Sequence, residues 1–500
     1  MRNTSQINWN KVFSGNAIYI ILLMAVSFLI YSNSLGGDYI IDDIARIQNN
    51  KHIHDLGAYF SNHFRWDAGS FHEAMLAVIW HMSGGRPFGF HLYNVILHVF
   101  CVILVFALCM ALFKNRLLSF LASLIFAVHP IHTEAVSWIS GNPYLLSSLF
   151  YLGVFVSYLK AKQERRYYLL CASLLFVGFL FAQEVILVPF MIIAYELFFN
   201  SGKDFFKKEK WPLLILSAAV ISISVVALIS LYISRAKYSH MIFTYRGWRY
   251  LIVAIKAFSY YLKILYLPLA RGLYHPFAFT TVSIDKVSPL FFVSIFIALS
   301  LIILCFKTKN KLMPVSFGIM WFFIAYLPYS NLVPICNIIS ERYMYLSSVG
   351  ICIVLAALFL KAWDVINSNT KYKKAFRYVA IIVMVLFLSS YATLTLSRNY
   401  EYHNIITYWW SNINNFQDGY IVYNNLAGTF YAMGDLDNAL AYSYTNLMSN
   451  RFQPHVWCNL GKIYTDLKDF DQAAYCYKQA LEIDENYFPA IKSLEGIELE

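Results

Sequence analysis

Long apolar windows recur along most of this sequence, and they restrict the fold more than any other feature. A helix needs about 20 mostly apolar residues to cross a bilayer. Windows near that length, several of them shorter, lie at 17–33, 91–113, 117–129, 144–159, 167–182, 185–199, 212–233, 288–306, 314–328, 343–360 and 377–396. The chain is 59% hydrophobic with a mean hydropathy of +0.53, which is more apolar than a soluble domain. The sequence therefore predicts an all-α polytopic membrane protein with about 11 transmembrane helices.

Basic residues mark the loops that should face the cytoplasm. They cluster in 160–166, 201–210, 307–311 and 361–377, and the positive-inside rule places such loops on the cytoplasmic side. The exterior side then receives 34–90, 130–143, 183–184, 234–287, 329–342 and everything after about residue 398. The net charge of +11 is explained by this topology, so we expect no nucleic-acid partner.

One apolar stretch, 246–268, does not fit as a span, because counting it would move the 307–311 loop outside. We expect it to be interfacial or re-entrant. Arg249, Lys256 and Lys263 recur on one helical face of it. Such cations point either at a cavity or at lipid headgroups, and the sequence leaves both open.

The exterior tail contains a repeat. Leu426 and Leu460 are 34 residues apart, as are Ala439 and Ala473, and this period is typical of tetratricopeptide repeats. A third partial helix is expected near Pro489 as a cap. The predicted domains are a membrane domain at 1–397, a connecting segment at 398–416 and a repeat domain at 417–500, whose 12 Asp and Glu outnumber 5 Lys and Arg. Its concave surface would bind a peptide or protein, and a disulfide between Cys458 and Cys476 is one option for the two cysteines on its helices.

Five polar clusters fall on the exterior ends of apolar windows, which favours a shared cavity. They are Asp42 with Asp43; His91, Asn94 and His98; His129, His132 and Glu134; Gln183 with Glu184; and Glu341 with Arg342.

Each cluster also has a structural interpretation. His91 and Asn94 could be inter-helix hydrogen bonds. His129, His132 and Glu134 are spaced weakly like metal ligands, but no second carboxylate or cysteine pattern supports a metal, and we predict none. Arg342 could pair with Glu341 or clamp a phosphate.

A specific resemblance connects these clusters. The runs YIIDDIARIQNN, RPFGFHLYNVILHVF, FAVHPIHTEAVSWISGN, QEVILVP and ERYMYLSSVG, followed by TLSRNYEYHNIITYWW and the repeats, resemble the transmembrane and tetratricopeptide-repeat O-mannosyltransferases. These belong to the protein O-mannosyltransferase superfamily, with the C-type glycosyltransferase fold, and the resemblance covers nearly the whole chain in order.

The resemblance implies transfer of a sugar, with mannose the expected one, from a polyprenyl-phosphate donor to a hydroxyl of a protein acceptor. It places this transfer at the exterior face, with inversion and without a cofactor. Asp42 and Asp43 match the acidic pair of the first exterior loop, and one of them, Asp42 in preference, would be the general base. Glu134, Glu184 and Arg342 match other polar positions of the cavity. Arg342, with Arg249, Lys256 and Lys263, would hold the donor phosphate.

The chain departs from the family pattern at two places. SFHEAM (70–75) stands where the family often has Tyr-Arg-Pro, and Asn142 stands where an Arg often follows Ser-Gly. Both changes remove cations near the expected donor site. The repeat region is also short for the family, which leaves the acceptor class open.

Two alternatives to protein glycosylation remain at this point. The enzyme could transfer a sugar to a lipid or surface glycan, or the chain could be a non-catalytic membrane scaffold that recruits a partner through its repeats. We expect the bacterial inner membrane with periplasmic repeats, the alternative being the endoplasmic reticulum with the repeats in the lumen.

Overall fold

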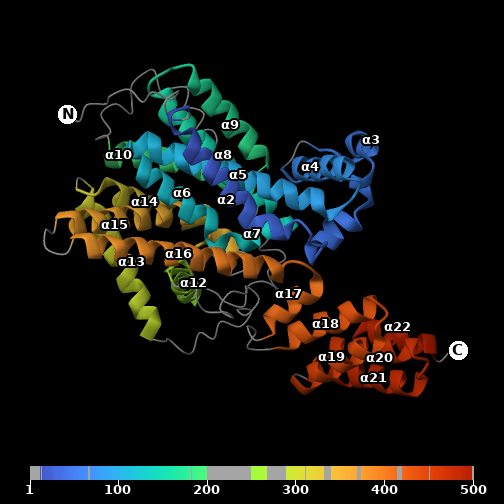
Figure 1. The fold of residues 1–500 in the computed structure, drawn as a ribbon. Coiled ribbons are helices and arrows are strands. Elements are labelled where there is room, and N and C mark those ends of the chain that lie inside the picture. Colours follow the sequence, from blue (N-terminus) through green and yellow to red (C-terminus); the bar gives the residue numbers. More distant parts are fainter. Residues whose placement is uncertain are drawn as a thin grey trace. The chain divides into compact units, whose positions relative to one another are not determined.

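The computed structural model describes residues 12, 14–65, 68–181, 183–199, 249–266, 289–309, 311–331, 339–368, 373–413, 419–449 and 451–497. Every regular element in these ranges is helical, as predicted (Figure 1). The chain divides into two compact units, one of residues 1–269 and 282–402 and the other of 270–281 and 403–500.

The α-helices of the first unit are mostly apolar. They are α2 (Ala17–Tyr31), α3 (Leu56–Ala58), α4 (Ala68–Ser83), α5 (Pro87–Phe113), α6 (Arg116–Val128), α7 (Thr133–Ser137), α8 (Asn142–Ala161), α9 (Tyr167–Phe181), α10 (Val188–Phe199), α12 (Arg249–Tyr266), α13 (Pro289–Thr308), α14 (Met313–Tyr326), α15 (Ser348–Ser368) and α16 (Lys373–Glu401). Short 3-10 and π segments join them, among them η3 (Ile44–Gln48), η5 (Tyr59–His63), η6 (Pro130–His132), η7 (Ile139–Gly141), η8 (Gln183–Leu187) and η12 (Glu341–Met344).

Several of these helices are suited to a bilayer by length and composition. Five described segments pass both criteria: Ala17–Ser34, Pro87–Phe113, Ile139–Ala161, Ser348–Ser368 and Lys374–Glu401. A sixth span results if Arg116–Val128 and Pro130–Ser137, bent by 51°, count as one. Shorter apolar helices are Tyr167–Phe181, Val185–Phe199, Phe292–Thr308 and Met313–Tyr329.

Every predicted window except 212–233 overlaps one of these segments, and 212–233 lies outside the described residues. The chain is therefore a polytopic helical membrane protein, and the total of about 11 spans stays a prediction. Helix α12 does not pass these criteria, but neither do several helices predicted as spans, so whether residues 246–268 cross the membrane stays a prediction.

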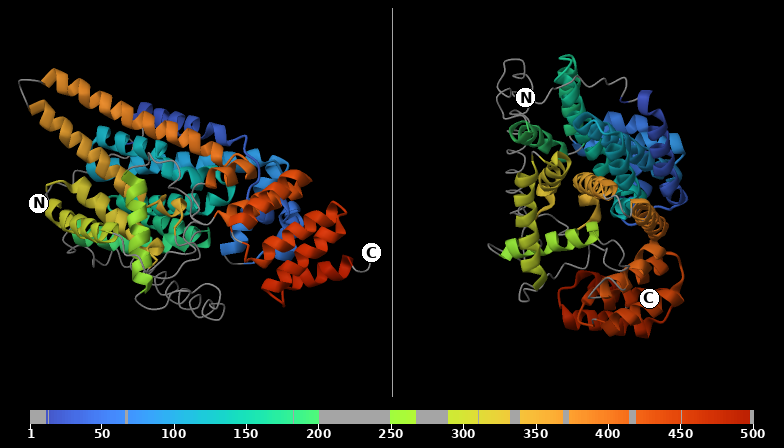
Figure 2. Two further views of the ribbon diagram at one scale, coloured as in Figure 1. Left: turned by 90° about the horizontal axis from the view of Figure 1, so that it is seen from below. Right: turned by 60° about the vertical axis from the view of Figure 1, so that its left-hand side comes forward.

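Small residues let two of the spans approach closely. A Cβ on Gly318 of α14 would lie 2.4 Å from the Gly350 carbonyl oxygen of α15. Within a bilayer no hydrophobic effect drives helices together, so such close backbone contact supplies much of the packing energy. Helices α15 and α16 in turn lie side by side over much of their length (Figure 2).

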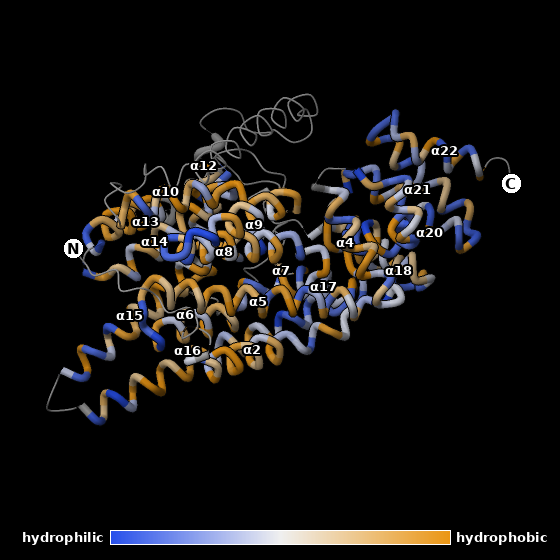
Figure 3. Tube along the Cα trace, turned by 90° about the horizontal axis from the view of Figure 1, so that it is seen from above, coloured by the Kyte–Doolittle hydropathy of each residue, from blue (hydrophilic) through white to orange (hydrophobic). Residues whose placement is uncertain are grey.

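The second unit is a helical repeat domain, and it begins with α17 (Ile405–Asn412). Its other helices are α18 (Tyr420–Ala432), α19 (Leu436–Ser449), α20 (Pro454–Asp466), α21 (Phe470–Ile483) and α22 (Phe488–Ile497). Leu426, Ala439, Leu460 and Ala473, the residues that define the 34-residue period, are all buried. Hydrophilic residues are frequent on the surface of α20 to α22, whereas α2, α5 and α6 are largely hydrophobic (Figure 3).

The predicted repeat details are mostly met. The capping helix α22 buries Ala490 and packs Leu494 against the neighbouring core. The first repeat is degenerate, since Ser443 and Asn446 occupy the buried places of Tyr477 and Ala480. Cys458 and Cys476 are separate buried thiols in this structure, so the optional disulfide is not formed.

Candidate active site

The loop that follows α2 places its two aspartates in opposite environments. Asp43 is fully buried just before η3, whereas Asp42 beside it is exposed. One carboxylate oxygen of Asp43 accepts hydrogen bonds from the Ser140 hydroxyl and, at 2.8 Å, the Ser140 N–H; the other accepts the Ile40 N–H at 3.2 Å. Asp43 thus fastens this loop to η7, while Asp42 stays exposed on its surface.

Burial also changes the proton affinity of Asp43. Removal from water raises the pKa of Asp43 from 3.8 to about 7, and the adjacent Asp42 charge adds a smaller rise. The hydrogen bonds from Ser140 and Ile40 act in the opposite direction. The raised pKa thus belongs to the enclosed member of the pair.

A second buried cluster surrounds Glu134, at the bend between α6 and α7. Its carboxylate accepts the Ser340 hydroxyl at 2.9 Å, the Arg342 N–H at 2.9 Å and the Arg342 guanidinium. The Ser340 N–H in turn donates to the Tyr261 hydroxyl of α12 at 2.9 Å. The structure therefore joins Glu134 directly to Arg342, two residues that the sequence placed only in a shared cavity, and it ties α12 to the same cluster.

The guanidinium of Arg342 lies among aromatic rings beside a narrow pocket. Its carbon is 5.1 Å from the centre of the Trp138 ring and 5.3 Å from that of Tyr343, within cation–π range. The pocket, lined also by Tyr144 and Ser147, has a volume of about 10 Å³, which is room for a single water molecule. The Ser147 hydroxyl is buried and has no hydrogen-bond partner among the described residues. Arg342 is thus a buried cation with an unused hydroxyl on the same pocket.

The neighbouring pair corrects one option from the sequence. Arg342 does not pair with Glu341; Glu341 instead forms a two-pronged contact with Arg398 of α16, at 2.9 and 2.7 Å. Both partners are buried, and Arg398 also reaches the Pro130 carbonyl at 3.5 Å. This second ion pair anchors α16 to the bend that carries Glu134.

The histidine and asparagine clusters serve largely as contacts between helices. The Asn94 amide donates to the Trp138 carbonyl at 2.9 Å, and His98 meets the Tyr345 hydroxyl at 2.7 Å. His132 contacts the Ser348 hydroxyl at 2.8 Å, and His129 accepts the Ile131 N–H at 3.2 Å. These contacts favour the structural interpretation of these residues.

His91 lies against the first loop. A Cβ on Gly37 would be 2.9 Å from its Nε2 atom.

Among the described residues, no three His, Cys, Asp or Glu side chains gather as they would around a metal ion.

The structure describes the remaining predicted site residues only in part. Lys256 is half-buried on α12. The side chains of Arg249, Lys263 and Glu184 lie outside the part of the chain that the structure describes. Their roles stay predictions.

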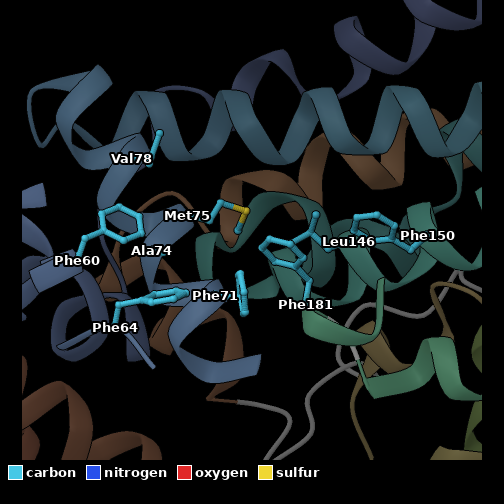
Figure 4. Close-up of a pocket in the computed structure, with 9 residues that line it drawn as sticks. All are labelled: Phe60, Phe64, Phe71, Ala74, Met75, Val78, Leu146, Phe150 and Phe181. Carbon is cyan, nitrogen blue, oxygen red and sulfur yellow. The ribbon is translucent and has the colours of Figure 1, made fainter. Parts of the chain in front are cut away.

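The SFHEAM segment forms one wall of an apolar pocket. Phe71, Ala74 and Met75 of α4 face Phe150 of α8 and Phe181 of α9 across a cavity of about 290 Å³ (Figure 4). The segment that departs from the family pattern therefore contributes apolar surface here instead of a cation.

Some residues of the site carried little signal in the sequence. Ser140 and Ser340 are neutral and common, and Tyr261 is one of 38 tyrosines. Arg398 did have a signal, since it is a charge at the exterior end of an apolar window, where charges are usually paired. This position makes Arg398 a candidate site residue on the same grounds as Arg342.

This fold and site define a polytopic helical membrane protein with a buried acidic and cationic centre and a tetratricopeptide domain. Residues 68–229 match the family described as dolichyl-phosphate-mannose-protein mannosyltransferase, and 454–487 match the tetratricopeptide repeat. The resemblance predicted from the sequence is therefore confirmed over these residues.

Individual relatives extend the similarity along the chain. Protein O-mannosyl-transferase TMTC3 of Mus musculus is 24% identical over 96% of this chain and 56% of its own length. Tmtc3 of Drosophila melanogaster is 22% identical over 93% of this chain and 58% of its own. TMTC1 of Homo sapiens reaches 38% identity, over 27% of this chain and 17% of its own. The chain thus spans a little over half the length of the relatives that it matches most fully.

Proposed function

We propose that this protein transfers mannose from a polyprenyl-phosphate donor to a hydroxyl of a protein acceptor at the exterior face of the membrane, with inversion at the sugar carbon. The names of the relatives, protein O-mannosyl-transferases, support the reaction class. The observation that supports the site most is the contrast between exposed Asp42 and buried Asp43 in the same loop.

Asp42 is the general base in this proposal. It removes the proton from the acceptor hydroxyl while that oxygen attacks the first carbon of the sugar, and such a base contributes about 10²–10⁴-fold. The bond from this carbon to the phosphate oxygen breaks, and the electron pair leaves with polyprenyl phosphate. One displacement of this kind inverts the carbon.

Asp43 holds the loop in place. Its carboxylate oxygens are taken up by Ser140 and Ile40, and it is buried, so an acceptor hydroxyl cannot reach it without breaking those bonds. We therefore assign Asp43 a positioning role.

Arg342 stabilises the leaving phosphate. A guanidinium suits phosphate oxygens, and it acts strongly where water is excluded. The narrow pocket at Arg342 must widen for a phosphate to enter, which requires the tyrosine side chains around it to move. The repeats would recruit the acceptor, and the lipid bilayer would hold the donor. The membrane concerned is the bacterial inner membrane or that of the endoplasmic reticulum, with the repeats and Asp42 on the same exterior side in both.

The test is transfer of radiolabelled mannose from polyprenyl-phosphate mannose by the purified full-length protein, with thermal melting in detergent as the check on folding. Asp42→Asn should lower turnover by about 10²–10⁴-fold at an unchanged melting temperature. Asp55→Asn is the matched control, because Asp55 is an exposed residue of the same loop whose capping role asparagine can replace. Wild-type turnover in Asp42→Asn would remove this residue from the chemistry. Label found in lipid or glycan instead of protein would favour the alternative acceptor.

A further inference from the structure

A long apolar groove lies between α10, α13 and α14, apart from the residues discussed so far. Helix α14 contacts both of the others, and all three are hydrophobic along this side (Figure 3). The groove has a volume of about 560 Å³, and Leu197, Ile302 and Phe306 line it while remaining 55%, 41% and 65% exposed. Its opening therefore faces the surroundings of the spans, which in a membrane are lipid chains.

One end of the groove carries a cation. Lys309 lines it, with its Nζ 4.5 Å from the centre of the Phe198 ring. Lys307, in the last turn of α13, and Lys311, in the short connection to α14, flank it. The base of this end is tied down, because Cys305 donates to the Ser316 carbonyl at 3.3 Å and the hydroxyls of Thr308 and Ser316 meet at 2.7 Å.

The position of the lysines assigns the groove to one leaflet. The 307–311 loop belongs on the cytoplasmic side by the positive-inside rule. The lining residues of α10 and α13 come from the last turns of these helices before that side, whereas Asp42 lies on the exterior side. A lipid in the groove thus has its headgroup at the face opposite to the sugar-transfer site.

We propose that this groove binds an anionic glycerophospholipid of the cytoplasmic leaflet, with its acyl chains along α10, α13 and α14 and its phosphate next to Lys309. Basic pockets between transmembrane helices on the cytoplasmic side recognise such headgroups by charge, and a long lysine side chain extends its ammonium group to the membrane surface. A donor carrier is a poorer fit, since its phosphate must lie at the exterior end. The choice of a phospholipid over the donor carrier rests on the proposed function, whereas the groove and its cation do not depend on it.

The test measures lipid association of the full-length protein in phosphatidylcholine vesicles by electron spin resonance. The probes are spin-labelled phosphatidylglycerol and spin-labelled phosphatidylcholine, and the signal is the immobilised fraction of each. Lys309→Gln removes the cation, and Ile319→Trp fills the groove. Lys361→Gln is the matched control, an exposed lysine towards the cytoplasmic end of α15 that does not line the groove.

The wild-type protein should prefer phosphatidylglycerol, and Lys309→Gln should lower that preference roughly five-fold, the factor that corresponds to about 1 kcal/mol for one cation at the membrane surface. Lys361→Gln should keep the preference, and Ile319→Trp should reduce the immobilised fraction. Equal immobilisation of both lipids, unchanged by Lys309→Gln, would overturn the proposal. Displacement of the bound label by added polyprenyl phosphate would also overturn it, because the groove would then belong to the donor chain.

Discussion

Two buried arginine–glutamate pairs of the membrane unit, one at Arg342 and one at Arg398, differ in what surrounds them. The Glu134–Arg342 pair borders a pocket that contains aromatic rings and a serine hydroxyl with no hydrogen-bond partner in the described part of the chain. The Glu341–Arg398 pair has two matched contacts, at 2.9 and 2.7 Å, and Arg398 also binds a backbone carbonyl of the α6–α7 bend. Both arginines are buried, yet Arg342 borders a pocket and Arg398 lies at a junction between helices.

The comparison teaches that burial of an ion pair alone does not identify a functional charge. A buried pair is weak evidence for stability as well, because desolvation offsets much of the attraction. What separates the two pairs is the pocket, which borders the guanidinium of Arg342 and not that of Arg398. We therefore expect Arg398 variants to change folding and Arg342 variants to change turnover.

The largest expected effect is on stability. Arg398→Gln leaves the Glu341 carboxylate buried without its partner, which should cost about 3–5 kcal/mol of unfolding free energy. The measurement is melting temperature in detergent, and Arg116→Gln, at an exposed arginine of α6, should leave it nearly unchanged. The double variant Glu341→Leu/Arg398→Met should recover most of the loss. An unaltered melt for Arg398→Gln would show that the pair is not the junction that we describe.

The next effect is on catalysis. Arg342→Gln removes a cation from the proposed phosphate site, so turnover should fall by about 10²–10³-fold. The variant should lose only part of its stability, because Glu134 still accepts hydrogen bonds from the Ser340 hydroxyl and from the backbone N–H of residue 342. The measurement is the rate of mannose transfer, and the comparison is sharpened by Arg342→Lys, which keeps the charge and loses the planar fork. Equal turnover in wild type and Arg342→Gln would place the phosphate elsewhere.

The buried carboxylate Asp43 extends the comparison to pH. The folded protein keeps the Asp43 proton up to a pKa of about 7, whereas the unfolded chain loses it near 3.8, so the folded state binds more protons between these values. Stability contributed by this group must then fall as pH rises from about 4 to about 7. The free energy of unfolding across this range should fall by on the order of 1 kcal/mol or more further in wild type than in Asp43→Asn. Melting temperatures measured at each pH check this, and those of wild type should fall more steeply. Parallel curves would mean that Asp43 is ionised in the folded protein.

The smallest expected effect concerns Ser340. Ser340→Ala deletes one donor to Glu134 and should cost about 1 kcal/mol, since the carboxylate retains Arg342. Ser348→Ala is a suitable comparison, because its hydroxyl meets His132 and not a carboxylate. Melting of both variants measures the difference. A loss as large as that of Arg398→Gln would indicate that Ser340 and not Arg342 holds Glu134.

Much of this arrangement was accessible from the sequence, because the bilayer imposes a simple length and polarity rule. The spans and the polar residues at span ends, Glu134 and Arg342 among them, follow from that rule, and the repeats follow from their 34-residue period. Their pairing does not, since Glu134 and Arg342 are 208 residues apart and no periodicity connects them. The rule says that Glu341 needs a partner, and only the packing of α16 selects Arg398 over the adjacent Arg342. The Asp42–Asp43 contrast likewise depends on Ser140, a neutral residue without a pattern of its own.

The most direct test of this account is the affinity of the purified protein for polyprenyl phosphate, the proposed leaving group, in variants of the two arginines. Binding can be followed by the rise of the melting temperature with added ligand. We predict that Arg342→Gln weakens binding at least about ten-fold, the loss expected for a charge-assisted contact, while Arg398→Lys binds as the wild type does. Equal affinity in wild type and Arg342→Gln would contradict the assignment of Arg342 to the donor phosphate.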